Sequence, residues 1–235
     1  MAKDTISEVS KWKTPLTELV PVNYGEFFTY SKWDVILGVI DAKLTNTQVV
    51  IPTNGAWLDL PVVNSLVRYR QIKIINFSVN AYLEETYEKF TGLPYFTVDK
   101  IRAASMIIRN KRPDITQWFS MVYDPLYQSE MEKQLFIDHW SKYGYPQIIP
   151  ASNCGRSKLR ITTTLPCRSI FSDLVIGMDR KISSCCFDAR FSMDLGYLGN
   201  SVLDTWINQP LYSLRESHNS GRRKEIALCA SCSFA

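Results

Sequence analysis

Three absences narrow the class of protein to which this sequence of 235 residues can belong. No apolar run approaches the ~20 residues of a membrane-spanning helix, so we expect no membrane partner. No signal peptide is visible, which argues against a secreted fold built on disulfides. The net charge of +4 is too small to indicate nucleic-acid binding without a concentrated basic face. With six cysteines and no export signal, we expect a cytoplasmic protein.

The sequence has two histidines, which argues against most active sites built on histidine. His139 and His218 fall on or just after expected helices, where a lone histidine is more often a surface or core residue than a ligand. No serine–histidine–aspartate set or paired carboxylates stand out. The only notable basic cluster, 222–224, follows an expected helix, which favours contact with helix-end carbonyls over contact with RNA.

The first 150 residues do contain a regular alternation of apolar and amphipathic segments. The expected strands are 19–23, 48–52, 72–79, 115–123 and 147–150. The expected helices are 4–12, 32–42, 60–67, 83–90, 98–109 and 130–143. This alternation is typical of an α/β fold, in which helices cover a parallel sheet and functional loops follow the carboxyl ends of the strands.

From about residue 151 the pattern changes to shorter strand-like runs and one late helix, expected at 202–217. We therefore predict two domains, a larger one at 1–150 and a smaller α+β module at 151–235. A chain of 27.0 kDa is long enough for a core with an appended module.

All six cysteines lie in this smaller module. Cys167 precedes an apolar run that we expect to form a hairpin with a turn at 179–180, and the pair Cys185 and Cys186 follows. Cys229 and Cys232 form a Cys-x-x-Cys near the end of the sequence. Such a set can bring four thiolates to one point, which suits tetrahedral zinc or an iron–sulfur cluster, and spacing does not decide between them. The alternative is that these cysteines are small buried hydrophobes.

Motifs around these cysteines resemble a known family. They are 166–167, 173–176, 178–182, 185–188, 198–206 and 229–232. Together they resemble the SPASM extension of radical S-adenosylmethionine (SAM) enzymes, which holds an auxiliary [4Fe–4S] cluster. The resemblance implies Cys167, Cys185, Cys229 and Cys232 as ligands, with Cys186 as a substitute for Cys185 and Cys154 dispensable. Arg180 replaces the family's usual glycine, so we expect the turn to close without easy access to positive φ.

The loops of the larger domain resemble the radical SAM partial barrel, a parallel (β/α) fold related to the TIM barrel. The segment Tyr24-Gly25-Glu26-Phe27 stands where the family has Gly-Gly-Glu-Pro, which binds the SAM amino group. By this resemblance Gly25 and Glu26 would meet the amine. Ser78 and Asn80 would face the ribose or carboxylate, and Thr53 and Asn54 would line the cavity.

The family's catalytic Cys-x-x-x-Cys-x-x-Cys loop has no counterpart, because no cysteine precedes Cys154. The resemblance therefore implies an incomplete barrel that lacks its first strand, and an enzyme only if a missing N-terminal segment or a partner subunit supplies the cluster loop. The alternative is a non-catalytic binding or scaffold module stabilised by the auxiliary cluster or by zinc. Relatives modify peptides, proteins or small molecules, so the substrate stays open.

Overall fold

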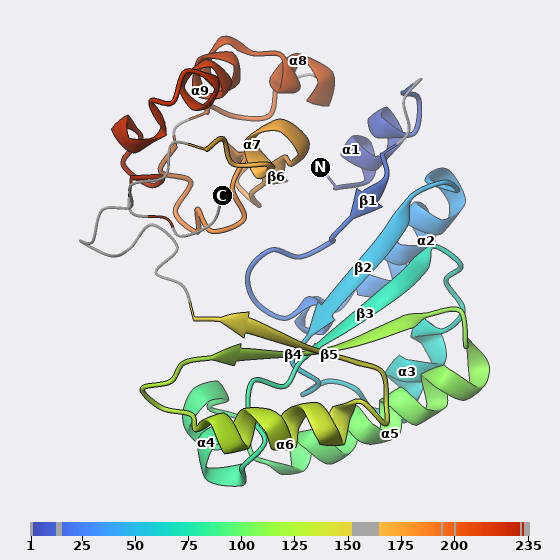
Figure 1. Cartoon of the computed structure of the whole chain (residues 1–235). Coiled ribbons are helices and arrows are strands. Elements are labelled where there is room, and N and C mark those ends of the chain that lie inside the picture. The colour runs from blue at the N-terminus through green and yellow to red at the C-terminus, as the bar shows by residue number, and fades with distance from the viewer. Residues whose placement is uncertain are drawn as a thin grey trace. The chain divides into compact units, whose positions relative to one another are not determined.

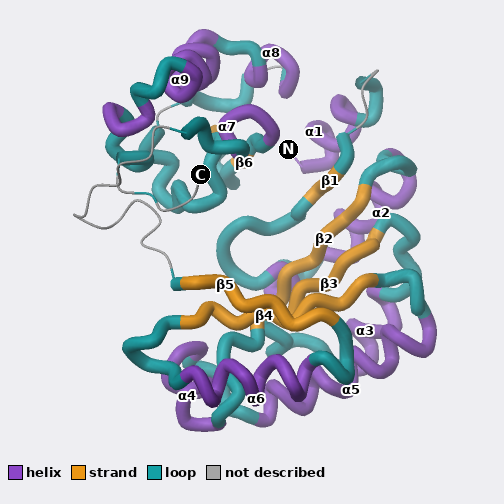
Figure 2. Tube along the Cα trace, viewed as in Figure 1, coloured by secondary structure: helices purple, strands orange, loops and turns teal. Residues whose placement is uncertain are grey.

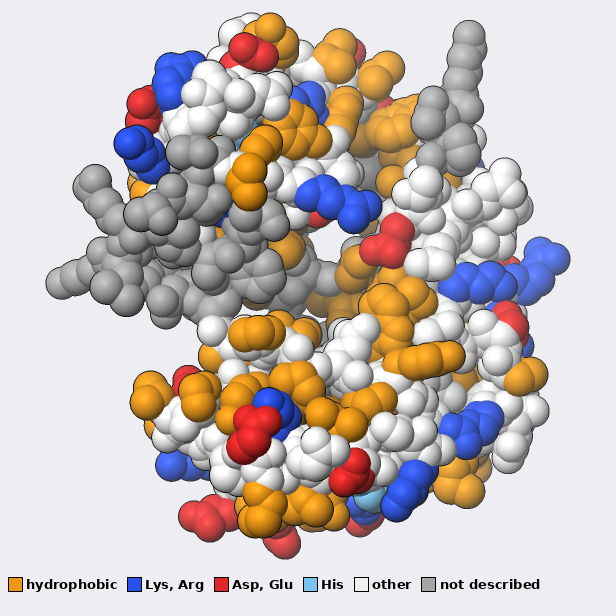
Figure 3. All heavy atoms as spheres, viewed as in Figure 1, with side chains coloured by type: hydrophobic (Ala, Val, Ile, Leu, Met, Phe, Trp, Pro, Cys, Tyr) orange, Lys and Arg blue, Asp and Glu red, His pale blue; other side chains and the backbone are white. Residues whose placement is uncertain are grey.

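The computed structural model describes residues 2–12, 16–151, 165–193, 195–199, 201–230 and 232. The chain divides into two compact units, Met1–Ala151 and Ser152–Ala235. Cys154 lies outside the described residues. Within the described part, no helix is long and apolar enough to cross a membrane. On the face drawn in Figure 3, basic side chains are interspersed with acidic and apolar ones, as the mild net charge suggests.

The first unit contains a five-stranded parallel sheet whose strands follow one another in chain order (Figures 1 and 2). The strands are β1 (Glu18–Leu19), β2 (Gln48–Thr53), β3 (Ile72–Ser78), β4 (Thr116–Tyr123) and β5 (Tyr145–Pro150). The helices are α1 (Ala2–Val9), α2 (Trp33–Lys43), α3 (Leu60–Leu66), α4 (Glu84–Thr91), α5 (Phe96–Lys111) and α6 (Glu130–Trp140), with a 3₁₀ turn η1 (Phe27–Thr29). This confirms the predicted α/β class and the strand order of a partial barrel.

Apolar strands and aromatic packing form the core of this unit. Val49 and Ile51 in β2 and Ile72 and Ile75 in β3 are fully buried, as expected for central strands covered on both faces. Phe119 of β4 stacks on its neighbours from β3 and α6, with ring centroids 5.1 Å from Phe77 and 4.5 Å from Trp140. These contacts pack α6 against the sheet at β4.

Strand β1 is shorter than the sequence pattern predicts, because it ends at Leu19 instead of residue 23. Among the described residues it pairs with β2 alone, through the register Glu18 to Gln48 and Leu19 to Val49. Pro21 follows two residues later and has no N–H to donate to a ladder. The segment 20–26 is therefore a loop, which leads to η1.

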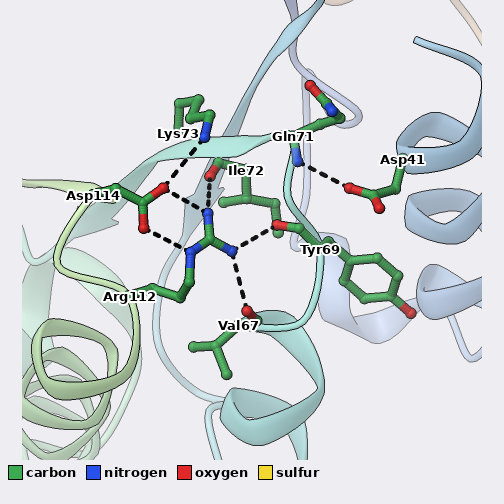
Figure 4. Close-up of polar contacts among 8 residues, drawn as sticks. All are labelled: Asp41, Val67, Tyr69, Gln71, Ile72, Lys73, Arg112 and Asp114. Carbon is green, nitrogen blue, oxygen red and sulfur yellow. Dashed lines mark hydrogen bonds and ion pairs between the residues drawn. The ribbon is translucent and has the colours of Figure 1, made fainter. Parts of the chain in front are cut away.

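A network around Arg112 ties the amino-terminal ends of the strands together (Figure 4). Its guanidinium donates to the backbone carbonyls of Val67, Tyr69 and Ile72 at 3.0 to 3.3 Å. It also forms an ion pair with Asp114 at 2.7 Å, and the Arg112 hydrogen bonds hold the pKa of that carboxyl well below its usual range. One side chain thus joins the loop before β3 to the loop before β4.

The second unit is built from short elements: α7 (Ser169–Ser172), β6 (Val175–Ile176), β7 (Ile182–Ser183), α8 (Val202–Trp206), α9 (Gln209–Asn219) and the 3₁₀ turn η2 (Arg223–Glu225). Strands β6 and β7 form an antiparallel hairpin. The hairpin expected directly after Cys167 is wrong in its first part, because Ile170 and Phe171 belong to α7. Short apolar runs fit a buried helix as well as a strand, which explains the error.

The single late helix predicted at 202–217 is also wrong, since the structure has two helices there. Helix α8 ends at Trp206, and Asn208 caps α9 by accepting a hydrogen bond from the Leu211 N–H at 2.9 Å. Pro210 lies in the first turn of α9, where its missing N–H costs nothing but where it cannot continue a preceding helix.

Candidate functional site

Arg180 closes the β6–β7 hairpin in the left-handed backbone region, with φ of 70°. The turn thus closes at positive φ although it lacks the glycine that reaches this region easily. A left-handed residue with a β-carbon costs about 1–2 kcal/mol. The Arg180 side chain offsets this cost by donating to the carbonyls of Leu198 and Gly199, both at 2.9 Å. The backbone adds a bond from the Leu198 N–H to the Arg180 carbonyl at 2.7 Å.

Cys185 follows β7 in a loop that a buried carboxylate organises. Asp188 accepts hydrogen bonds from the hydroxyls of Ser183 and Ser192 and from the Met193 N–H. The Cys185 N–H donates to the Ser183 hydroxyl at 3.3 Å. Cys185 is half-buried in this loop, whereas Cys186 is exposed.

The other three candidate ligands come from two other segments. Cys229 and Cys232 are buried and share a tight turn in which the Cys232 N–H donates to the Cys229 carbonyl at 3.3 Å. Cys167 is half-buried, and its N–H donates to Nδ1 of His218 at 3.1 Å. Four thiols thus reach the interior of the second unit from three separate parts of the chain.

The thiols lie near enough to influence each other electrostatically. The pKa of Cys229 is raised to about 12, chiefly by burial; the charge of Arg223 opposes the rise, and negative charge on Cys185, Cys232 and Cys167 adds to it. Burial also raises the pKa of Cys185 to about 11, with Cys186, Cys232 and Cys167 acting in the same direction. At neutral pH these two groups are therefore thiols, and they need a bound cation or cluster to ionise.

The four cysteine thiols lie in the same region of the second unit but do not form a complete set of metal ligands. Among the described residues, no three histidine, cysteine, aspartate or glutamate side chains are arranged to hold a metal ion. The chemistry of the donors nevertheless fits an iron–sulfur cluster, because four cysteine thiolates are its usual ligands. The effects of these thiols on one another's pKa values indicate that they lie within electrostatic range of one another.

In the first unit, the loop after β1 is tied to the end of β2 through one carboxylate. Glu26 accepts hydrogen bonds from the Thr53 hydroxyl at 3.0 Å, the Asn54 N–H at 2.7 Å and the Phe28 N–H at 3.3 Å. Gly25 precedes it with φ of 89°, a conformation that favours glycine. The structure thus brings Gly25, Glu26, Thr53 and Asn54 together, but the Glu26 carboxylate is occupied by protein donors.

Ser78 is the last residue of β3, and together with Asn80, two residues later, it makes a second group. Asn80 has φ of 68°, and its N–H donates to the Ser120 carbonyl at 2.9 Å. Its own carbonyl accepts from the Gln128 side chain at 2.7 Å, while its Nδ2 donates to the Ser78 carbonyl at 3.4 Å. Asn80 therefore fixes the end of β3 against the end of β4.

Sequence reasoning missed a polar row inside the sheet. The Ser120 hydroxyl in β4 donates to Oδ1 of Asn76 in β3 at 2.5 Å and lies 3.4 Å from Oε1 of Gln147 in β5. Each of these residues is a polar interruption of an apolar strand, and that interruption is the signal that marks them in the sequence. The row links three neighbouring strands through their side chains.

A cavity of about 440 Å³ lies at the opposite end, beside the first residues of β4 and β5. It is lined by Arg109, Gln117 and Tyr143, among others. In barrel folds the amino-terminal ends of the strands serve stability, whereas chemistry is placed at the carboxyl ends. This cavity therefore lies away from the loops that resemble a SAM site.

Residues 167–233 match the family model of SPASM, an iron–sulfur cluster-binding domain. The chain carries a SPASM domain. The matched region includes Cys167, Cys185, Cys186, Cys229 and Cys232, and it lies almost wholly in the second unit.

Solved structures resemble the chain over nearly all its length. BtrN in complex with AdoMet (SAM) and 2-DOIA has a TM-score of 0.63 and 16% identity, covering 100% of this chain and 79% of that one. Native anSMEcpe with AdoMet and the Cp18Cys peptide has a TM-score of 0.64 and 10% identity, covering 98% and 79%. A search of curated protein sequences finds no match. At these identities the likeness shows the fold, which is the radical SAM partial barrel followed by a SPASM domain.

Proposed function

We propose that this chain is a SPASM protein of the radical SAM superfamily in which Cys167, Cys185, Cys229 and Cys232 bind an auxiliary [4Fe–4S] cluster. The observation that carries the proposal is the placement of four thiols in one interior neighbourhood within the residues that match the SPASM model. A thiol-rich site of this kind suits a reducing compartment, which supports a cytoplasmic location.

A bound auxiliary cluster would supply electron transfer or a ligand site for substrate. The chain's own residues would hold it in a buried environment, with the Asp188 loop fixing Cys185 and the His218 ring fixing the Cys167 backbone. Such supporting contacts determine ligand orientation and affinity.

Anaerobic reconstitution with iron and sulfide tests the assignment. We expect a brown protein with about four iron and four sulfide per chain, in keeping with a [4Fe–4S] cluster. A chain that takes up about one zinc and neither iron nor sulfide would instead be a zinc-stabilised scaffold.

The finer proposal is that SAM cleavage depends on a three-cysteine segment outside residues 1–235, supplied by the same gene product or by a partner subunit. The support is that residues 1–153 contain no cysteine, so they cannot hold a second cluster. The fold does not select the substrate, because the similar structures hold a small molecule, 2-DOIA, in one case and a peptide in another.

This finer proposal has two measurable consequences. Residues 1–235 with SAM and a strong reductant should form no 5′-deoxyadenosine, and its formation would contradict the proposal.

The second consequence concerns binding. Residues 1–235 should still bind SAM weakly, and Glu26→Ala should abolish that binding because the substitution frees the loop after β1. Glu85→Ala, an exposed change on α4, is the control that should leave binding unchanged. Absence of SAM binding by the unmodified chain would favour the alternative, a non-catalytic module that keeps the auxiliary cluster.

A further inference from the structure

Arg223 is a buried cation beside the four-cysteine site. Its side chain is 1% exposed, whereas its neighbours Arg222 and Lys224 are exposed. Burying a guanidinium is costly unless the surroundings compensate its charge. Because Arg223 is buried while the basic residues on either side of it are exposed, its charge, and not theirs, is expected to have a specific role.

The contacts of Arg223 reach both flanks of the cysteine site. Nη1 donates to the carbonyl of Leu165, two residues before Cys167, at 3.3 Å. Nη2 donates to the carbonyl of Cys232 at 3.4 Å. One guanidinium thus spans the chain segments that carry the first and the last of the four thiols.

The charge of Arg223 also acts on the thiols. Burial raises the pKa of Cys229, and the positive charge of Arg223 opposes that rise. Such an effect requires the guanidinium to lie near the sulfur in a poorly screened interior. The same charge would stabilise any anion that the thiols hold.

His218 does not provide a second positive charge here. Its side chain is 1% exposed, and its Nδ1 accepts the Cys167 N–H, so the ring proton lies on Nε2 and the ring is neutral. The cysteine segments are thus contacted by the neutral ring of His218 and by the permanent cation of Arg223.

We propose that Arg223 is the buried counter-charge of the auxiliary cluster and raises the cluster's reduction potential. This inference rests on the proposed function, that is, on cluster binding by the four cysteines. A cluster held by four thiolates is an anion, and reduction adds one more negative charge. A fixed cation nearby therefore favours the reduced form, because net charge and surroundings set the potentials of such clusters.

The test is a reductive titration of the reconstituted chain followed by electron paramagnetic resonance. Arg223→Gln should shift the potential of the cluster to more negative values, whereas Arg223→Lys should stay close to the unmodified chain. Lys224→Gln removes the same formal charge from an exposed neighbouring position, where solvent and salt screen it. It should shift the potential much less than Arg223→Gln does.

An Arg223→Gln potential equal to that of the unmodified chain, or shifted no more than in Lys224→Gln, would overturn the inference and leave the proposed function intact. If Arg223→Gln fails to retain iron and sulfide, retention by Arg223→Lys supports the role of the charge. Loss of iron and sulfide in both variants overturns the inference, because the shape of the guanidinium and not its charge would then be what the site needs. An unmodified chain that assembles no cluster overturns the proposed function and the inference together.

Discussion

At the scale of single residues, Arg180 shows how a side chain can replace the glycine of a turn. Its left-handed backbone is maintained by two hydrogen bonds to carbonyls about twenty residues further along the chain. The sequence places an arginine at this position, but it does not reveal those distant acceptors. The turn conformation was consequently not predictable from local propensity alone.

This arrangement predicts an order of stabilities for two variants. Arg180→Ala loses the side-chain hydrogen bonds and keeps the strain of a β-carbon, whereas Arg180→Gly loses the bonds and relieves the strain. We expect Arg180→Gly to be more stable than Arg180→Ala by about 1 kcal/mol. Urea unfolding of both variants measures the difference, and an alanine variant as stable as the glycine variant would contradict the account.

A second residue-scale prediction concerns Asp114. Its folded-state pKa is lowered mainly by the hydrogen bonds from Arg112, so ionised Asp114 stabilises the fold. That contribution is fully present above the unfolded-state pKa of about 3.9 and is lost as the pH falls through the folded-state pKa. Because Asp114 is about half exposed, at 48%, solvent screening reduces the effect.

The comparison of the unmodified chain with Asp114→Asn measures this contribution. The difference between their urea midpoints should be largest above pH 4 and should shrink as the pH falls toward 2. A difference that stays constant over this interval would show that the Asp114 charge does not contribute.

At the scale of elements, sequence periodicity found all five strands of the sheet and their parallel order. Long, apolar segments such as β3 were easy to recognise, because burial on both faces leaves little room for polar residues. Errors occurred where segments were short, as at Ile170 and Phe171, or where a tertiary contact decided the outcome, as at the cap formed by Asn208. The burial of Arg223 was likewise invisible, since its exposed neighbours have the same charge.

The edge strand β1 gives a prediction at this scale. It has two residues and, in the part of the chain that the structure describes, pairs on one side only, with β2, so its ladder should open far more readily than that of β3. Hydrogen exchange of the chain should show fast exchange at Leu19 and slow exchange at Ile75. If a segment carrying the three-cysteine motif is supplied and pairs with β1, Leu19 should become protected. Slow exchange at Leu19 in residues 1–235 alone would show that the edge is already closed.

At the scale of the whole molecule, the two units have separate tasks in this account. The first has the fold of the partial barrel in the AdoMet-bound structures, and its loop at Gly25-Glu26 is tied to the end of β2. The second carries the cysteines within its SPASM match. Under the proposed function, residues 167–232 bind the auxiliary cluster, and SAM cleavage needs the first unit together with a further cluster supplied from elsewhere.

The central claim is that four particular cysteines bind one cluster, and the iron and sulfide content of cysteine variants tests it most directly. After anaerobic reconstitution, alanine replacement of Cys167, Cys185, Cys229 or Cys232 should each remove most of the bound iron and sulfide. Cys154→Ala and the exposed-site control Cys186→Ala should retain about the content of the unmodified chain. Retention of a full cluster by Cys229→Ala, or its loss in Cys186→Ala but not in Cys185→Ala, would contradict the account.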